Sequence, residues 1–427
     1  THLIDFDLLT QMELLKETDY ASVNFGDDPT SVDYERIFYA RRPILETAVK
    51  NFLANQAFQA DFKHFEKNNQ LWLDDFAEFM AIKEYFGNQA LQKLDDKKAV
   101  ARDPKTLEKY RTMLAEQIQY FKVTQYFFFK QWGELKDYAN QKGIKIIGDM
   151  PIYVAADSVE VWTKPELFQL DKERNPFFVA GVPADQFSAT GQLWGNPLYA
   201  WKEHKKQGYA WWIHRIEESF KIYDVLRIDH FKGFSDYWQV DGKADIAKYG
   251  SWQPGPGYDL FKAVKEQLGD LPIIAEDLGN IDDKARKLLA DCNYPGMKIL
   301  QFGFEDVSGK SLDSPHYCIP HSIVYTGTHD NDVTNGWYNG LTEQQQQYIN
   351  DYTHRSEDES ICQAMIRQLF ATVSNTAIAT MQDVLDLPAS SRMNVPSTIG
   401  GNWQWRMQQS DLTQDKKDFL AKMTTLY

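Results

Sequence analysis

The stretch from Val225 to Phe234 reads VLRIDHFKGF, an apolar run broken by Arg227 that ends in Asp229, His230 and a turn containing glycine. A strand buried on both faces is a continuous apolar run, and a charge within it is costly unless it is paired or used. Arg227 and Asp229 are two positions apart, so on a strand their side chains point to the same side. The stretch predicts a buried strand with a charged pair at its carboxyl end. If this were the only such pair, it would be best explained as a buried Arg–Asp pair that fixes the packing. Other predicted strands, however, also end in acidic residues.

Further strand-like runs alternate with helical stretches after residue 143. They are Lys145–Val154, Pro272–Ala275, Lys298–Phe304, Ile323–Thr326 and Ala377–Met381. This alternation is typical of an α/β fold with parallel strands and crossover helices. We predict a TIM-type (β/α)8 barrel with helical and loop insertions. With Val225–Ile228 the runs amount to six strands, whereas such a barrel has eight, so we expect the first two strands to be missing from this chain.

The rest of the chain is assigned to insertions in one catalytic barrel spanning residues 1–427. Residues 31–143 have helical periodicity, with a helix start at Asp103-Pro104 and a helix end at Gly143. Residues 155–223 form a long excursion between two strands, rich in Gly, Pro and Trp in its middle part. Loops of this length in a compact domain are usually binding elements or lids, so we expect this excursion to bind substrate.

The composition excludes several classes of partner. The net charge is −15 without a basic stripe, which argues against nucleic acid and anionic membranes. No apolar run approaches the length of a membrane span. The three cysteines are widely spaced, which fits reduced thiols in a cytoplasmic protein. We find no signal peptide, no phosphate-binding glycine loop and no spaced His/Cys cluster, and we predict neither a cofactor nor a metal.

Acidic residues follow four of the predicted strands. They are Asp149, Asp229, the pair Glu276-Asp277, and Asp330 beside His329. One acid after one strand is a common helix cap, but acids after four strands of one sheet are not explained by capping. Barrel enzymes keep their reactive groups at this edge of the sheet. Two carboxyl groups here can approach to about 5–5.5 Å, the separation used by retaining glycosidases.

Several longer segments resemble one family. RIDH, AEDLG and THDND, preceded by GDMPIYV, resemble segments of α-amylase-like glycoside enzymes. More narrowly, FSATGQLWGNPLY, PGMKILQFGF, YTGTHDND and RMNVPSTIGGNWQWR look like the 4-α-glucanotransferases, the family of amylomaltases and disproportionating enzymes. The resemblance covers essentially the whole chain. It implies transfer of α-1,4-glucan segments between maltooligosaccharides or starch- and glycogen-derived glucans, with glucose among the acceptors.

The resemblance also implies a role for each matching residue. Asp229 corresponds to the nucleophile, Glu276 to the general acid/base and Asp330 to a third carboxylate that favours the distorted sugar ring. Arg227 would hold Asp229 in its ionised form. Substrate-orienting roles fall to Asp149 and His329.

The resemblance also implies two loops beside the substrate cleft. Phe187, Gln192, Trp194 and Asn196 lie in the glucan-wrapping loop, where Trp194 is the candidate for stacking on a sugar ring. Asn394 belongs to a second loop.

The sequence departs from the family pattern in three places. The strand that reads like VLLHPTSLPG and a second strand ending near SPY are absent. Ala184 and Gln186 stand where the family often has Pro and sometimes Tyr, and Val333 and Ser397 replace a usual Thr and Gly. None of these changes touches the three proposed catalytic carboxylates. An α-glucan hydrolase with the same carboxylates and a non-catalytic glucan-binding fragment stay open as alternatives.

Overall fold

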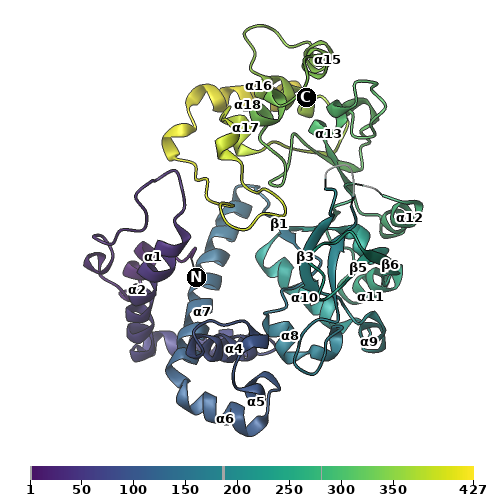
Figure 1. Ribbon diagram of the computed structural model, residues 1–427. Coiled ribbons are helices and arrows are strands. Elements are labelled where there is room, and N and C mark those ends of the chain that lie inside the picture. The colour runs from purple at the N-terminus through teal and green to yellow at the C-terminus, as the bar shows by residue number, and fades with distance from the viewer. Residues whose placement is uncertain (1, 185–187, 280) are drawn as a thin grey trace. The chain divides into compact units, whose positions relative to one another are not determined.

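The computed structural model describes residues 2–184, 188–279 and 281–427. The chain divides into two compact units (Figure 1). Unit 1 consists of Thr1–Phe25 and Tyr34–Pro272, and unit 2 of Gly26–Asp33 and Ile273–Tyr427.

Helices make up the first half of unit 1. The helices of this unit are α1 (Phe6–Gln11), α2 (Tyr34–Ala54), α3 (Gln59–Asn68), α4 (Leu73–Tyr85), α5 (Lys97–Val100), α6 (Pro104–Met113), α7 (Ala115–Gln141), α8 (Val159–Thr163), α9 (Trp201–Lys206), α10 (Ala210–Ile222) and α11 (Tyr258–Leu268). The predicted start of α6 is confirmed, since the Asp103 carboxylate accepts from the Thr106 amide at 2.9 Å and Pro104 is the first helical residue. The long helix α7 ends before Gly143, whose φ of +76° suits glycine. Aromatic rings of α2, α3 and α7 pack together, with the Phe52 and Phe127 centroids 5.2 Å apart.

Two parallel strands of unit 1 position Asp149 and Arg227. Strands β1 (Ile147–Met150) and β4 (Val225–Ile228) pair with Asp149 opposite Arg227. Gly148 is required in β1, because a Cβ there would lie 2.1 Å from the Tyr223 ring. The register places the two charged positions side by side at the carboxyl ends of both strands.

An antiparallel sheet in unit 1 was not predicted. It runs in the order β3 (Gln192–Pro197), β2 (Phe178–Val182), β5 (Asp236–Asp241) and β6 (Gly250–Pro254). Val179 pairs with Val240, and both are buried beside Ala247. Part of the excursion at residues 155–223 is therefore built on a sheet, which holds the Gln192–Pro197 segment in an extended conformation.

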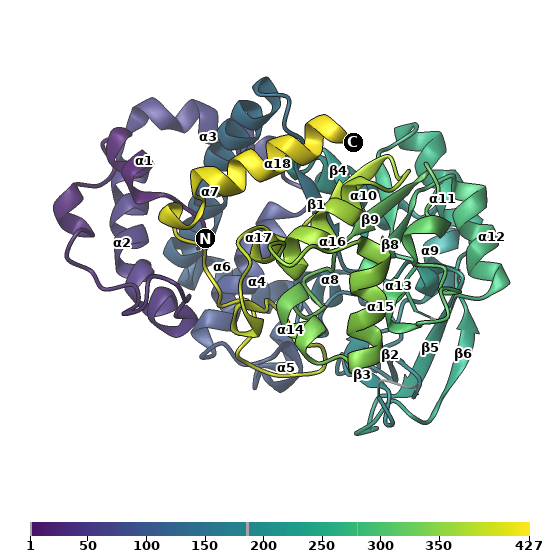
Figure 2. The ribbon, with the colours of Figure 1, turned by 90° about the horizontal axis from the view of Figure 1, so that it is seen from above.

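Unit 2 contains a second group of parallel strands. Its elements are β7 (Ile273–Ala275), α12 (Asp283–Cys292), β8 (Gly296–Ile299), α13 (Leu300–Glu305), β9 (Ser322–Tyr325), α14 (Thr334–Asn339), α15 (Glu343–Thr353), α16 (Ile361–Phe370), β10 (Thr376–Ile378), α17 (Met381–Val384) and α18 (Gln414–Leu426). Strands β8, β9 and β10 pair in parallel in the order β10-β9-β8, with α15 and α16 beside β9 (Figure 2). Buried residues Leu300, Phe304, Val324, Ile349, Met365 and Leu369 form the core of this part.

Two strand predictions in unit 2 were wrong in their bounds. Residues Ala377–Met381 were expected to be a strand, but β10 spans Thr376–Ile378 and α17 begins at Met381. Residues Lys298–Phe304 were expected to be a strand, but β8 ends at Ile299 and α13 follows directly. The helical turn lets Leu300 and Phe304, four positions apart, face the same buried cluster. A continuous apolar run does not distinguish these two conformations.

The α/β class predicted from the sequence is confirmed. Within the described ranges the parallel strands do not close into a barrel, so the barrel and the absence of its first two strands are not confirmed. The assignment of residues 1–427 to one catalytic barrel with two insertions stays a prediction. Across the same ranges, every helix is too short or too polar to cross a membrane.

Candidate functional site

The charged pair at the end of β4 has a third member. One guanidinium nitrogen of Arg227 donates to both carboxylate oxygens of Asp149, at 2.7 and 2.8 Å, and to Asp229 at 2.9 Å. The Arg227 side chain is 9% exposed, whereas the two aspartates are 39% and 40% exposed. A buried cation thus anchors two accessible carboxylates, both of which the sequence assigned to the site. Charge-assisted bonds of this kind are short and hold the carboxylates in a fixed orientation.

The residue after Asp229 makes a sharp turn. His230 has φ +51° and ψ +50°, in the left-handed region, and begins the short 3₁₀ helix Phe231–Phe234. Burial lowers the pKa of His230 to about 4, so the imidazole is neutral near pH 7. Its ring meets the Trp194 ring edge-on, with centroids 4.8 Å apart and planes at 86°. This contact connects the turn that carries Asp229 to strand β3.

Strand β3 brings three of the predicted loop residues to this place. The Trp194 indole donates to Gln192 at 3.3 Å and also lies near Tyr153, with centroids 6.3 Å apart. The Asn196 amide donates to the carbonyl of Val154 at 2.9 Å, in the loop that follows β1. Phe187, the fourth loop residue, lies outside the described residues. Trp194 is 36% exposed, so part of its ring is free to stack on a ligand.

In unit 2, two acids follow strand β7 and have different surroundings. Glu276 is half-buried, and its carboxylate accepts from the Leu278 amide at 2.7 Å. Asp277 accepts from the Met297 amide at 2.7 Å, and burial raises its pKa. A Cβ at Gly296 would lie 2.4 Å from the Asp277 carboxylate, so this glycine makes room for it. Asp277 therefore joins β7 to β8 structurally, whereas Glu276 keeps an accessible carboxyl group.

The predicted residues His329, Asp330 and Asn394 lie together. The Asn394 side-chain amide donates to Asp330 at 2.6 Å, and the His329 ring nitrogen is 3.5 Å from the other Asp330 oxygen. Arg392 holds the two segments together, because its guanidinium donates to the main-chain carbonyls of Asp330 at 2.7 Å and Asn394 at 2.8 Å. The Trp403 ring packs on His329 at a centroid distance of 5.1 Å. The result is a carboxylate that is held in place and half-exposed, with an imidazole beside it.

Three of these residues were not singled out from the sequence. His230, Arg392 and Trp403 all stand in segments that drew attention, RIDH and RMNVPSTIGGNWQWR. The signal that could have found His230 is its place next to an acid at a strand end. The contacts of Arg392 and Trp403 depend on the packing of the loop after α17 against residues 329–330, which has no local sequence pattern.

One group among the described residues has a composition suited to a metal ion. His214, Glu217 and Glu218 of α10 bring their ligand atoms within 4.8 Å of one another. Lys221 already neutralises Glu218, with its ammonium 2.5 Å from the carboxylate. We therefore assign no metal to this group.

Each unit, taken by itself, carries groups of the kinds that glycosyl transfer uses. Unit 1 contributes an oriented carboxylate, Asp229, and an indole face, Trp194. Unit 2 contributes Glu276 and the Asp330–His329 pair. A nucleophile, a proton donor and a further carboxylate are the components of a retaining mechanism.

Comparisons with known proteins agree with this chemistry. Residues 1–413 match the family described as 4-alpha-glucanotransferase. A 4-alpha-glucanotransferase of Streptococcus pneumoniae serotype 4 is 51% identical over 428 residues, covering 100% of this chain and 84% of the relative. One from Clostridium butyricum is 42% identical, covering 100% and 87%. The solved structure of an amylomaltase from Streptococcus agalactiae in complex with acarbose is 57% identical and has a TM-score of 0.98, covering 100% of this chain and 86% of that one.

Proposed function

The chain belongs to the 4-alpha-glucanotransferase family, and we propose that it moves α-1,4-glucan segments by a retaining double displacement. The donors are maltooligosaccharides and glucans derived from starch or glycogen. The acceptor is the 4-hydroxyl of another glucan or of glucose. The acarbose bound by the S. agalactiae relative supports a maltooligosaccharide substrate.

In the first step Asp229 acts as the nucleophile. Its carboxylate oxygen attacks the anomeric carbon of the donor and forms a glycosyl ester, while the bond from that carbon to the leaving 4-oxygen breaks. Glu276 gives its proton to the leaving oxygen. This step requires the two carboxyl groups about 5–5.5 Å apart. The contact that carries the proposal is Arg227 to Asp229 at 2.9 Å, because it orients the attacking carboxylate.

In the second step the acceptor replaces the first product. Its 4-hydroxyl oxygen attacks the ester carbon, Glu276 takes the hydroxyl proton, and the Asp229 carboxylate is released unchanged. The configuration at the anomeric carbon is inverted twice and so retained. Asp149 is proposed to orient the donor beside the nucleophile.

Asp330, His329 and Asn394 are proposed to bind the sugar ring at the cleaved bond. The Asn394 amide donates to one Asp330 oxygen at 2.6 Å and so orients the carboxylate, which with the neighbouring imidazole is proposed to bind sugar hydroxyls. A carboxylate near the ring stabilises the positive charge that develops in the oxocarbenium-like transition state.

Transfer requires that a sugar, rather than water, reach the glycosyl ester. Trp194 offers a partly exposed indole face next to the Asp229 turn, and we propose that it receives the acceptor together with Gln192, Asn196 and Phe187. An aromatic wall of this kind also excludes water. The similar proteins are named transferases, so hydrolysis and binding without turnover are not favoured.

The test is incubation of the protein and its Asp229→Asn variant with maltotriose. The unaltered protein should yield glucose together with oligosaccharides longer than maltotriose. The variant should lose the reaction by at least about 10³-fold, because a nucleophile acts in the chemical step, while its far-UV circular dichroism stays unchanged. Glucose and maltose alone would indicate a hydrolase, and full turnover by the variant would move the nucleophile elsewhere.

Two broader expectations belong to the same proposal. The parallel strands of both units are proposed to be parts of one (β/α)8 barrel, which an experimental structure of the longest natural form of this protein would test. The cytoplasm is proposed as the location, because Cys292, Cys318 and Cys362 are free thiols, as expected in a reducing compartment. Fractionation of the native cells would test this location.

A further inference from the structure

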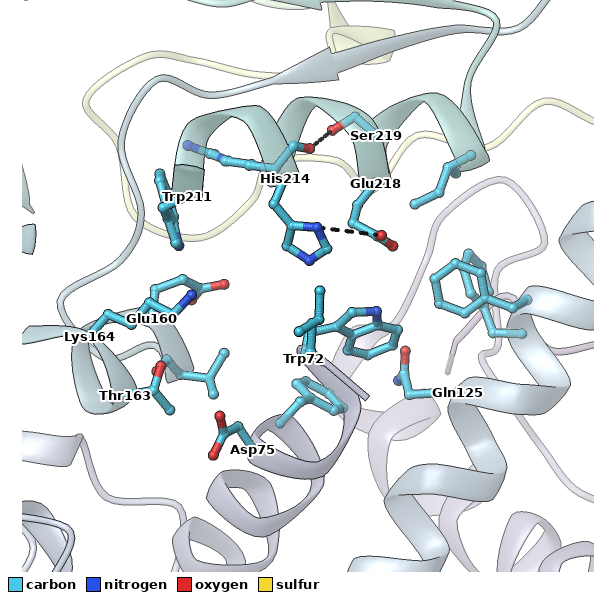
Figure 3. Close-up of a pocket in the computed structure, with 17 residues that line it drawn as sticks. Trp72, Asp75, Gln125, Glu160, Thr163, Lys164, Trp211, His214, Glu218 and Ser219 are labelled. Carbon is cyan, nitrogen blue, oxygen red and sulfur yellow. Dashed lines mark hydrogen bonds and ion pairs between the residues drawn. The ribbon is translucent and has the colours of Figure 1, made fainter. Parts of the chain in front are cut away.

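A cavity in unit 1 is lined by none of the residues assigned to transfer. Its volume is about 420 Å³, and its walls come from α4, α7, α8 and α10 (Figure 3). Small-molecule sites generally range from about 300 to 1,000 Å³. The side chains of α10 point across the cavity toward those of α4, with α8 at one side (Figure 3).

The apolar part of the wall is a set of aromatic rings fixed by packing. Trp72 lies against Phe129 at a centroid distance of 5.6 Å and against Phe76 at 6.1 Å. Across the cavity, Trp211 contacts Phe168 edge-on at 6.2 Å. Trp72, Phe76 and Phe129 are each half-buried, so part of each remains open to a ligand. Preorganised indole faces bind flat partners at little entropic cost.

The polar part of the wall contains groups without protein partners. Gln125 and Glu160 both line the cavity, and within the described ranges their side chains take part in no hydrogen bond or ion pair. The Nε2 atom of His214 is buried and likewise has no hydrogen-bond partner among the described residues. A ligand that supplies a partner to the buried His214 nitrogen gains free energy, whereas the half-buried Gln125 and Glu160 can exchange water for ligand hydroxyl groups.

The combination selects one chemical class of ligand. A purely apolar molecule would bury the amide, carboxylate and imidazole without partners, at a cost. A phosphate-bearing ligand would meet the carboxylates of Asp75, Glu160 and Glu218, which outnumber the cations Lys164 and Arg215 in the wall. A sugar ring has an apolar face for an indole and hydroxyl groups for the amide, carboxylate and imidazole. A neutral sugar fits both parts of the wall.

We propose that this cavity is a second α-glucan-binding site, which takes a short run of glucose units apart from the catalytic residues. The proposal rests on the proposed function for the choice of glucan. It gives the protein a means of holding a long chain at more than one point, and two linked contacts raise the effective concentration of the reacting segment.

The test uses the Asp229→Asn protein, which should leave maltoheptaose intact, in titration calorimetry. We expect two classes of binding site. Adding Gln125→Leu and Glu160→Leu together should weaken one class by at least about tenfold. The matched control is Glu166→Leu, since Glu166 is exposed nearby and does not line the cavity; it should leave both classes unchanged.

Hydrogen exchange gives a second measurement that needs no cavity variant. Maltoheptaose should slow amide exchange in residues 159–163 and 210–222. A single class of sites without this protection would overturn the proposal, and so would protection that depends on protein concentration rather than on sugar. If Asp229→Asn retains transfer, the nucleophile assignment fails. The second site can then still be tested, because amide exchange in α8 and α10 is measured with acarbose in place of maltoheptaose.

Discussion

At the scale of single residues, the role of Glu276 can be isolated by changing the leaving group. Glu276→Gln should lower transfer from maltotriose by roughly 10²–10⁴-fold, because the leaving oxygen then lacks its proton. With α-glucosyl fluoride no proton is needed to form the ester, so a burst of fluoride of about one equivalent per enzyme should precede a slow steady state. Asp277→Asn is the matched control. Asp277 is the next residue along the chain, and its carboxylate accepts a hydrogen bond from the Met297 amide. Equal losses with both substrates would show that Glu276 is not the general acid.

The residues of the candidate site were predictable where a local rule applied. Alternation along a strand placed Arg227 and Asp229 on one side, and their contact at 2.9 Å agrees with that. Arg227 also bonds Asp149, which depends on the register of β1 against β4. A single sequence contains no signal for that register. The hydrogen bond from Arg392 to the Asp330 carbonyl was also missed, because it joins two segments that are distant in sequence.

At the scale of elements, strand β3 presents Trp194 to the site, and its role can be separated from simple packing. Trp194→Ala should shift the products from longer oligosaccharides toward hydrolysis by roughly tenfold, since stacking contributes on the order of 1–3 kcal/mol and water needs no platform. The ratio is measured as released glucose against elongated products from maltotriose. Trp252→Ala is the control, because Trp252 is similarly exposed, 42% against 36%, on β6. If Trp194 only packs the loop, both activities will fall together and the ratio will stay constant.

Helix α9 contains a histidine that should make stability depend on pH. His204 is fully buried, its Nε2–H donates to the Leu167 carbonyl at 3.1 Å, and burial lowers its pKa from 6.5 to about 4. Between these values the unfolded chain binds one proton more than the folded chain. The free energy of unfolding should therefore fall as the pH drops from 6.5 to 4, by about 1.4 kcal/mol per pH unit from this residue.

The substitution His204→Gln keeps an amide that can donate to Leu167 and removes the titrating ring. Its urea midpoint, followed by tryptophan fluorescence, should depend less steeply on pH than that of the unaltered protein. His64→Gln is the control, since His64 is exposed. Equal slopes for the unaltered protein and His204→Gln would mean that His204 does not titrate in this range.

Elements with strong local patterns were predicted and the others were not. The caps of α6 and the strand at Val225–Ile228 follow from residue chemistry and apolar runs. The sheet of β2, β3, β5 and β6 was missed, since three of its strands are interrupted by glycine (Gly181, Gly195 and Gly250) and its central pair joins Phe178 to the distant Asp241. The start of α13 was missed because an apolar run suits a strand and a buried helix equally.

At the scale of the whole molecule, the division into two units depends on contacts between distant segments. Residues 26–33 lie within the N-terminal part of the sequence but belong to unit 2, where Ser31 pairs with Trp405 and Val32 donates to Gln404 at 2.7 Å. No local feature of residues 26–33 indicates this pairing. The net charge of −15, in contrast, is a property of composition and was available at once.

The proposed catalytic residues come from both units, Asp229 from unit 1 and Glu276 and Asp330 from unit 2, and this predicts how an inhibitor acts on the whole chain. Acarbose should slow amide exchange in residues 225–234 and also in residues 326–331. At 100 times its dissociation constant, a ligand stabilises the bound state by about 2.7 kcal/mol, which corresponds to roughly 100-fold slower exchange for amides that open only in the free form. Hydrogen-exchange mass spectrometry with and without acarbose measures both segments in one experiment.

The variant Asp330→Asn supplies the control for that measurement. Because Asp330 is proposed to grip the sugar, its loss should reduce protection in both segments together, and more acarbose should restore it. Tyr249→Phe, an exposed change in unit 1 outside the proposed site, should leave protection intact. Protection confined to residues 225–234 would show that Glu276 and Asp330 do not bind the same ligand as Asp229. In that case a double displacement shared by these carboxylates could not be the mechanism.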